Sequence, residues 1–215
     1  MLSLRLKTIA EMIPETRRLI DVGCDHALLD IYLAKKYPEM QFIATDVNYK
    51  ALSVAINNIK NNDLENQIST KLTDGLTDID LNDDDYIVIS GMGTKTIIHI
   101  LENQLDKTNN IIIQSNNDLE NLRLFMFQHN FKIANEKIVF DKKYYILIKF
   151  IKGKHNYQNE DLWLGPFVKE SGNITYFNYI LGYYQELIKT IPIDTDKYQA
   201  YQARIEYLNQ LIEKK

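Results

Sequence analysis

The stretch that most constrains the fold of this chain runs from Arg17 to Tyr37. It begins with a short apolar run, continues through an acidic turn that contains Gly23, and then places apolar residues at helical spacing. This pattern predicts a strand, a loop and a helix. In an open α/β sheet, ligands bind outside the carboxyl ends of the strands, so the loop after this first strand is the expected ligand site.

The rest of the chain alternates the same two patterns. The predicted strands are 18–22, 41–45, 67–72, 86–89 and 111–113, and the predicted helices are 3–13, 26–37, 48–62, 94–104 and 118–129, the last capped by Asp118. Two further strands, 131–140 and 143–151, are joined by so short a connection that they must be antiparallel.

This order of elements resembles the α/β, Rossmann-like, seven-stranded class I methyltransferases that use S-adenosylmethionine (SAM), in which an antiparallel seventh strand inserts into a parallel sheet. A doubly wound NAD-binding sheet does not predict the terminal hairpin. We therefore expect a methyltransferase domain over 1–152. The remaining segment, 153–215, should hold a polar linker and an antiparallel, coiled-coil-like α-helical hairpin, because apolar residues recur at spacings of three and four in 174–191 and 198–212. Its tyrosines fit seam packing better than stacking on RNA bases, which stays an alternative.

Composition narrows the class of protein. The chain has 215 residues, of which 45% are hydrophobic, enough for a substantial core. No apolar run reaches the roughly 18 residues that span a bilayer, and no signal-peptide pattern opens the chain. A single cysteine, Cys24, excludes an internal disulfide and a multi-cysteine zinc site. We expect a cytoplasmic protein.

Charge is unevenly distributed along the chain. The formal net charge is −4, and 73–85 is rich in aspartate, yet 132–154 carries seven lysines against Glu136 and Asp141. A basic surface on an acidic protein would suit a nucleic acid. The alternative is a set of scattered, solvated lysines.

Asp25 decides between two cofactor classes for the first loop. A dinucleotide fingerprint has a second glycine where this chain has Asp25, and a carboxylate there would repel a pyrophosphate. A cofactor that carries an ammonium and a sulfonium group is the better electrostatic match. The loop therefore favours SAM over NAD.

Acidic residues also follow the second and third strands. Asp46 is placed to accept both hydroxyl groups of a ribose, or alternatively to cap the next helix. Asp74 could accept from an adenine amino group, with Gly75 and Leu76 beside it, or could belong to a simple Asp-Gly turn.

The segment Ser90-Gly91-Met92-Gly93 lies where an acceptor base would meet the methyl group. Its glycines permit close backbone approach, and their alternative use is to begin the next helix. His26 could orient the cofactor, contact the target or bond to backbone. Asn116 could touch substrate or shape a turn.

These residues resemble the bacterial tRNA (adenine-N1)-methyltransferases that modify adenosine 22. The resemblance spans nearly the whole chain and is carried by Arg5-Leu6-x-x-Ile9-Ala10, Asp21-Val22-Gly23-Cys24-Asp25-His26-Ala27, Thr45-Asp46, Thr73-Asp74-Gly75-Leu76, Ser90-Gly91-Met92-Gly93 and Leu164-Gly165-Pro166. Many members have another glycine where this chain has Thr94, and proline-asparagine where it has Ser115-Asn116, which affects the detail of substrate contacts.

The resemblance implies a methyl transfer from SAM to N1 of an unpaired or extruded adenosine in the D-loop of tRNA, by direct displacement, without a metal, and with S-adenosylhomocysteine (SAH) as product. The implied partner is tRNA, with no DNA, membrane or obligate protein partner, and the enzyme is expected to be a monomer. The expected acceptor-pocket residues are His26, Gly91, Met92 and Asn116. The expected cofactor residues are Asp21, Gly23, Cys24, Asp25, His26, Asp46, Val47, Asp74, Gly75, Leu76, Gly91 and Met92. The expected tRNA contacts are Arg5, Lys132, Lys137, Lys142, Lys143, Lys152 and Lys154.

Three alternatives stay open on sequence alone. The first is the same fold acting on another RNA base, a small molecule or a protein. The second is a non-catalytic RNA-binding protein. The third is an NAD-dependent oxidoreductase.

Overall fold

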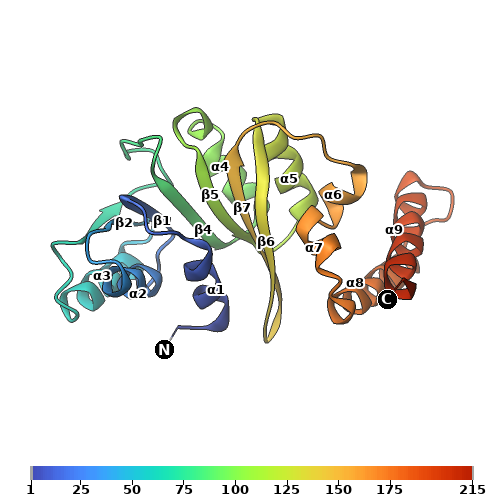
Figure 1. Ribbon diagram of the computed structural model, residues 1–215, viewed down its shortest axis with the longest axis horizontal. Coiled ribbons are helices and arrows are strands. Elements are labelled where there is room, and N and C mark those ends of the chain that lie inside the picture. Colours follow the sequence, from blue (N-terminus) through green and yellow to red (C-terminus); the bar gives the residue numbers. More distant parts are fainter. Residues whose placement is uncertain (1, 215) are drawn as a thin grey trace. The chain divides into compact units, whose positions relative to one another are not determined.

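The computed structural model describes residues 2–214, which divide into two compact units, with the boundary in the chain after Pro166 (Figure 1). The first unit is built on one seven-stranded sheet. Its strands are β1 (Arg18–Val22), β2 (Gln41–Asp46), β3 (Ile68–Leu72), β4 (Tyr86–Met92), β5 (Asn110–Ser115), β6 (Phe131–Asp141) and β7 (Lys143–Lys152). Their order across the sheet is β3-β2-β1-β4-β5-β7-β6.

The last two strands confirm the predicted antiparallel insertion. Strands β1 to β5 pair in parallel, whereas β7 lies between β5 and β6 and is antiparallel to both. Ile148 of β7 lies opposite Ile113 on one side and Glu136 on the other. The turn between β6 and β7 consists of Lys142 alone, so β7 must run back antiparallel beside β6.

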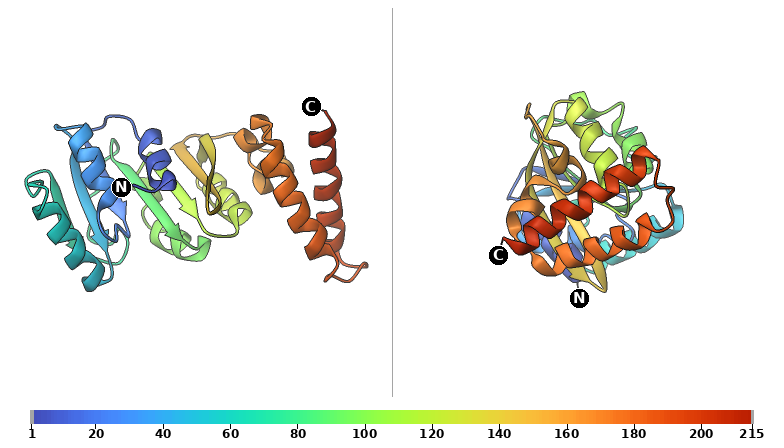
Figure 2. Two further views of the ribbon diagram at one scale, coloured as in Figure 1. Left: turned by 90° about the horizontal axis from the view of Figure 1, so that it is seen from below. Right: turned by 90° about the vertical axis from the view of Figure 1, so that its right-hand side faces the viewer.

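Two groups of helices cover the sheet. They lie on opposite sides of it, as Figures 1 and 2 show: α1, α2 and α3 on one side, and α4 and α5 on the other. The bounds are α1 (Leu4–Met12), α2 (Leu28–Lys36), α3 (Tyr49–Lys60), α4 (Thr94–Leu101) and α5 (Leu119–Gln128), with a 3₁₀ turn, η1 (Leu105–Lys107), between α4 and β5.

The centre of the core is formed by the two strands in the middle of the sheet. Residues 87–89 of β4 and 111–113 of β5 are fully buried, as their continuous β-branched runs predicted. A sheet covered on both faces keeps its strands fixed, so the loops at the carboxyl ends project from a rigid base.

Two helices interrupt the segment that was expected to be an irregular linker. They are α6 (Asn159–Trp163) and α7 (Pro166–Ser171). The buried guanidinium of Arg123 explains where α6 lies. It pairs with Glu136 at 2.8 Å and donates to the carbonyl oxygens of Leu162 and Leu164 at 2.9 and 3.3 Å. The first unit therefore extends to Pro166 rather than ending at residue 152.

Helix α5 does not use the cap that was predicted. Asp118 stands at the position before the helix, but its backbone is left-handed (φ 49°) and its side chain bonds to no helix amide. Its carboxylate instead accepts from the side chain of Asn121 at 2.7 Å. The left-handed turn directs the carboxylate away from the first helical N–H groups.

The second unit contains the predicted helical hairpin. Helices α8 (Ile174–Ile188) and α9 (Asp196–Glu213) pack against each other. The rings of Tyr184 and Tyr201 meet with centroids 5.2 Å apart, and the guanidinium of Arg204 lies 5.6 Å from each ring centre. Two tyrosines thus serve the packing between the helices.

Within residues 2–214, none of the helices combines the length and apolar character needed to cross a membrane.

Candidate cofactor and acceptor site

A cavity of about 420 Å³ opens at the carboxyl ends of β1, β2 and β4. It gathers eleven of the twelve expected cofactor residues, from loops far apart in the sequence. Its lining consists of Arg5, Leu6, Asp21, Val22, Gly23, Cys24, Asp25, His26, Leu28, Leu29, Thr45, Asp46, Val47, Thr73, Asp74, Gly75, Ser90, Gly91, Met92, Thr96 and Ile100.

The loop after β1 is shaped by three left-handed residues. Gly23 (φ 74°), Asp25 and Ala27 (both φ 52°) fold the chain back over the end of the strand. The amide of Gly23 bonds to the carbonyl of Thr45 at 2.8 Å, and a Cβ at Gly23 would collide with Cε of Met92. Because Ala27 is left-handed, α2 begins at Leu28 rather than near residue 26. Asp25 and His26 therefore belong to the loop.

Asp46 ties two of these loops together. Its Oδ2 accepts from the amide of Asp25 at 3.3 Å, and its Oδ1 accepts from the amide of Asn48 at 2.8 Å. The side chain that caps α3 is Asn48, whose Oδ1 accepts from the amide of Lys50 at 2.9 Å. The capping alternative for Asp46 is thus wrong, and its carboxylate stands at the cavity wall.

A pair of buried carboxyl groups lies behind the first loop. Asp21 of β1 lines the cavity, and Asp30 of α2 lies beside it in the interior. Burial, followed by the negative charge of Asp30, raises the pKa of Asp21 well above its usual value. Burial raises the pKa of Asp30 to about 6. The same surroundings raise the pKa of Cys24, so its thiol stays protonated and unreactive.

Arg5 brings a positive charge into this acidic cavity. It was expected to contact tRNA, yet its side chain lines the cavity, and its Nη1 donates to Oε1 of Gln114 at 2.5 Å. The same oxygen accepts from the amide of Gly91 at 3.1 Å. Gln114 is fully buried at the end of β5 and was not among the expected residues. Its one sequence signal is that a polar residue follows the isoleucines 111–113.

Two expected residues lie outside the cavity lining. Leu76 is buried in the core. Asn116 is held by the protein: its Nδ2 donates to the carbonyl of Gly91 at 2.7 Å, and its backbone amide donates to the carbonyl of Met92 at 2.8 Å. Asn116 therefore fixes the Gly91-Met92 segment.

His26 lies at the mouth of the cavity with about half of its side chain exposed. Its Nε2 is 3.5 Å from Oδ2 of Asp25. The carbonyl oxygen of His26 accepts from Nδ2 of Asn58 at 3.0 Å, so the backbone of the loop is held by a contact that does not involve the imidazole.

The expected tRNA contacts on the β6–β7 hairpin separate into two groups. Lys142 and Lys143 lie at the turn, close to α1, where Nζ of Lys143 and the guanidinium of Arg5 lie 5.0 and 5.4 Å from the centre of the Tyr145 ring. Lys137 lies within β6, between the middle of the strand and that turn, opposite Leu147 of β7.

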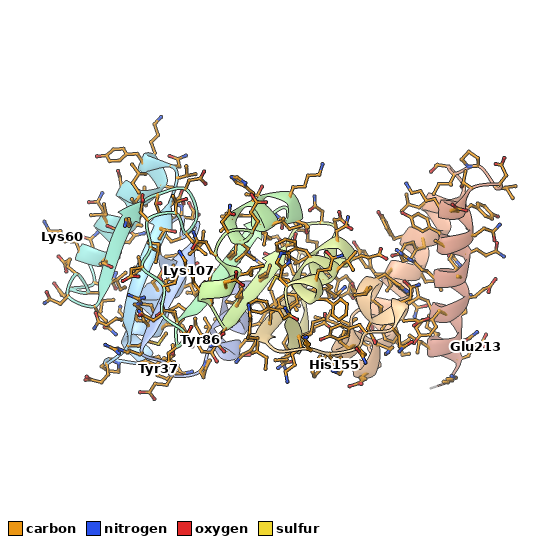
Figure 3. All side chains as sticks on the ribbon, turned by 90° about the horizontal axis from the view of Figure 1, so that it is seen from above. Tyr37, Lys60, Tyr86, Lys107, His155 and Glu213 are labelled. Atoms are coloured by element: carbon orange, nitrogen blue, oxygen red, sulfur yellow. The ribbon has the colours of Figure 1, made fainter. Side chains whose placement is uncertain are left out.

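The second group lies toward the other end of the hairpin. Lys132 pairs with Ile151, and Lys154 follows the end of β7. Lys152 donates to the carbonyl of Leu105 at 2.9 Å. Figure 3 labels two residues on this side of the sheet, at the end opposite the turn: Tyr86, which begins β4, and His155, which follows β7. Since the cavity lies at the carboxyl ends of the parallel strands, only the turn lysines are near it.

Comparisons with known proteins agree with this architecture. The family model described as a methyltransferase domain matches residues 2–148. A putative tRNA methyltransferase of Mycoplasma genitalium is 30% identical over 75% of this chain and 76% of its own. The tRNA (adenine(22)-N(1))-methyltransferase of Bacillus subtilis is 29% identical over 81% of this chain and 78% of its own.

Solved structures extend the likeness over the whole chain. The structure of M. capricolum TrmK in complex with the cofactor product SAH has 33% identity and a TM-score of 0.85, covering 99% of this chain and 98% of that one. A putative tRNA (m1A22) methyltransferase of Streptococcus pneumoniae, in complex with SAM, has 26% identity and a TM-score of 0.88, covering 99% and 100%. The sheet order, the cavity and these relatives together show that this chain belongs to the methyltransferase-domain family and, within it, to the tRNA (m1A22) methyltransferases.

Proposed function

We propose that this protein transfers a methyl group from SAM to N1 of adenosine 22 in tRNA. The observation that carries the proposal is the cavity in which Asp21, Asp46 and Asp74 come together from three successive strand ends in a chain of this family. A tRNA substrate implies that the enzyme acts in the cytoplasm, and we expect a monomer.

The charges of the cavity match the groups of SAM. Asp46 offers two carboxylate oxygens to the ribose hydroxyls, and the exposed Asp74 offers an acceptor to the adenine amino group. Asp21 faces the ammonium group at the amino-acid end. We assign the carboxylate of that end to Arg5, because its guanidinium lines the cavity, is always charged and can bind a carboxylate through two N–H groups.

When bound, SAM supplies a methyl group on a positively charged sulfur. The chain's own task is to hold adenine N1 in line with that methyl carbon, so that the N1–carbon bond forms as the carbon–sulfur bond breaks. Gly91 has a positive φ (84°) and no side chain, which lets a base approach the backbone closely. Asn116 donates to the carbonyl of Gly91 and Gln114 accepts from its amide, and these two hydrogen bonds fix the segment.

Adenine acquires a positive charge as it is methylated. Carboxylates at the cavity wall stabilise that charge, because they are fixed by protein contacts before the reaction begins. Asp25 at the mouth is the exposed carboxylate nearest His26, and this pair is our candidate acceptor for the exocyclic amino proton.

The turn lysines give the phosphates of tRNA a binding surface beside the cavity. Lys142 and Lys143 are exposed, and Lys143 shares the Tyr145 ring with Arg5. We propose that they hold the backbone near the target, whose N1 edge must be unpaired to enter the cavity. Lys137 would extend this surface, and Lys132 and Lys154 would reach only more distant phosphates.

The test is to incubate the protein with labelled SAM and unmodified tRNA and to map the methylated nucleotide. Methylation of N1 at adenosine 22 is the expected result, and methylation of another base or of free adenosine alone would overturn the substrate assignment. The K142E/K143E variant should lose most activity on tRNA while keeping its affinity for SAH. The K132E/K154E variant, with the same change in charge, is the control and should lose less.

A further inference from the structure

Asp21 and Asp30 form a buried pair of carboxyl groups between the cavity and the core. The exposed fractions of the two residues are 5% and 0%, and each carboxyl group lies close enough to the other to act on its ionisation. Among residues 2–214, no nitrogen or hydroxyl donor of another residue reaches either oxygen of Asp30. Two neighbouring carboxyl groups that are both buried cannot both ionise, because their negative charges repel and water does not hydrate them, so the pair retains one proton.

The surroundings determine which of the two carries the negative charge. Asp30 lies in the first turn of α2, where the helix dipole favours an anion. The negative charge of Asp46 acts on Asp21, while Cys24 and Asp25 of the following loop and Arg5 of α1 line the same cavity. Before cofactor binds, the proton therefore belongs on Asp21 and the charge on Asp30.

We propose that Asp30 is a positioning residue for the cofactor, because it takes the proton from Asp21 when an ammonium group binds against Asp21. The O–H bond of Asp21 breaks, an O–H bond forms on Asp30, and no proton is exchanged with solvent. This inference rests on the proposed use of SAM.

This proton transfer, which we call the relay, avoids the cost of keeping a permanently ionised carboxylate buried. An ammonium group needs an anionic acceptor, but a carboxylate kept permanently ionised and unpaired in the interior is strongly disfavoured. With Asp30 beside it, Asp21 becomes anionic only when a cation arrives, and it then accepts a hydrogen bond from the newly protonated Asp30. Binding at neutral pH should accordingly show no net proton release.

Two variants separate this role from simple packing. In Asp30→Asn, the amide donates permanently to Asp21, which is then held as an anion, so we expect SAH affinity within about threefold of the wild type. In Asp30→Leu, Asp21 has no neighbour to receive its proton and must release it to solvent. SAH affinity should then fall about 10- to 100-fold at pH 7, the loss of a charge-assisted hydrogen bond, and should recover as pH rises.

The experiment is isothermal titration of the three full-length proteins with SAH at several pH values, each in two buffers that differ in ionisation enthalpy. The control ligand is 5′-methylthioadenosine, which lacks the amino-acid end and should bind the three proteins alike. Infrared difference spectra should show a protonated carboxyl in the wild type both before and after SAH binds.

Three results would overturn the relay. The first is release of about one proton when the wild type binds SAH, and the second is equal SAH affinity of the Leu and Asn variants. The third is a loss of affinity for 5′-methylthioadenosine in Asp30→Leu as large as the loss of affinity for SAH. If the wild type bound neither SAM nor SAH, the proposed function would fail instead. The proton count on the wild type decides the matter even if the Leu variant does not fold.

Discussion

Arg5 on α1 donates a 2.5 Å hydrogen bond from Nη1 to Oε1 of Gln114 at the end of β5, across 109 positions of sequence. The same oxygen accepts from the amide of Gly91, so one buried side chain fixes both a cavity-lining cation and the acceptor segment.

Gln114→Leu should reduce methyl transfer about tenfold or more. The substitution leaves the guanidinium of Arg5 and the amide of Gly91 without their acceptor. Each buried donor left without a partner costs about 1–3 kcal/mol of free energy. Thermal unfolding and initial rates on tRNA measure the two effects. Gln114→Glu, which keeps an acceptor beside Arg5, is the control, and equal rates for the two variants would contradict the assignment.

Asp46→Ala should raise the dissociation constant for SAM about 10- to 100-fold. The variant loses charge-assisted hydrogen bonds to the ribose, which together contribute about 1.5–3 kcal/mol. It also releases the amides of Asp25 and Asn48, which loosens the loop. Asn48→Ala removes the helix cap but keeps Asp46, and so reports the effect of loosening alone. Unchanged SAM affinity in Asp46→Ala would show that the ribose assignment is wrong.

Gly23→Ala should be destabilising and should weaken cofactor binding. An alanine there must adopt φ 74°, which L-residues disfavour, and its Cβ would collide with Met92. The double variant Gly23→Ala/Met92→Ala removes the collision but not the strain, so it should recover only part of the lost stability. If the double variant recovered the full free energy of unfolding in urea, the backbone strain at position 23 would contribute nothing to the loss of stability.

The buried carboxyl pair should make stability fall between about pH 4 and pH 6. Asp30 has a folded-state pKa of about 6 against a usual value of 3.8, so the folded chain binds more protons in this interval. The proton bound by Asp30 stabilises the folded chain fully below pH 3.8, and this stabilisation is lost as pH rises through 6. The free energy of unfolding falls by about 3 kcal/mol at most. The free energy of unfolding of wild type minus that of Asp30→Asn should therefore decrease over this range. A difference that is flat or rises with pH would contradict the raised pKa.

A chain ended at Ser171 should fold, whereas one ended at Lys152 should be strongly destabilised. The shorter chain removes the carbonyl oxygens of Leu162, Trp163 and Leu164 that accept from Arg123, and leaves a buried guanidinium partly unpaired. We expect a loss of about 3 kcal/mol or more in urea unfolding. We also expect the 171-residue chain to retain SAH binding, because every residue of the cavity lining lies in the first unit. Full tRNA activity without α8 and α9 would exclude them from substrate binding.

Local sequence patterns determined where the strands lie, the direction of β7 and the class of cofactor. Period and composition located the strands, because buried parallel strands such as 87–89 and 111–113 must be continuously apolar. The short turn at Lys142 required β7 to be antiparallel. Asp25, in place of a glycine, identified a cationic cofactor, because a carboxylate cannot hold a pyrophosphate. These are properties of a few adjacent residues, and they need no knowledge of distant contacts.

Tertiary structure alone decided what distant residues do to one another. Arg5, which was expected among the tRNA contacts, lines the cavity because Gln114 accepts a hydrogen bond from it there. Asn116 lies outside the cavity lining, where its side chain donates to the carbonyl of Gly91. Asp30 looks like an ordinary first-turn helix residue until the fold buries it against Asp21. Burial, charge pairing and proton sharing depend on which groups the folded chain brings together, so no window of the sequence contains them.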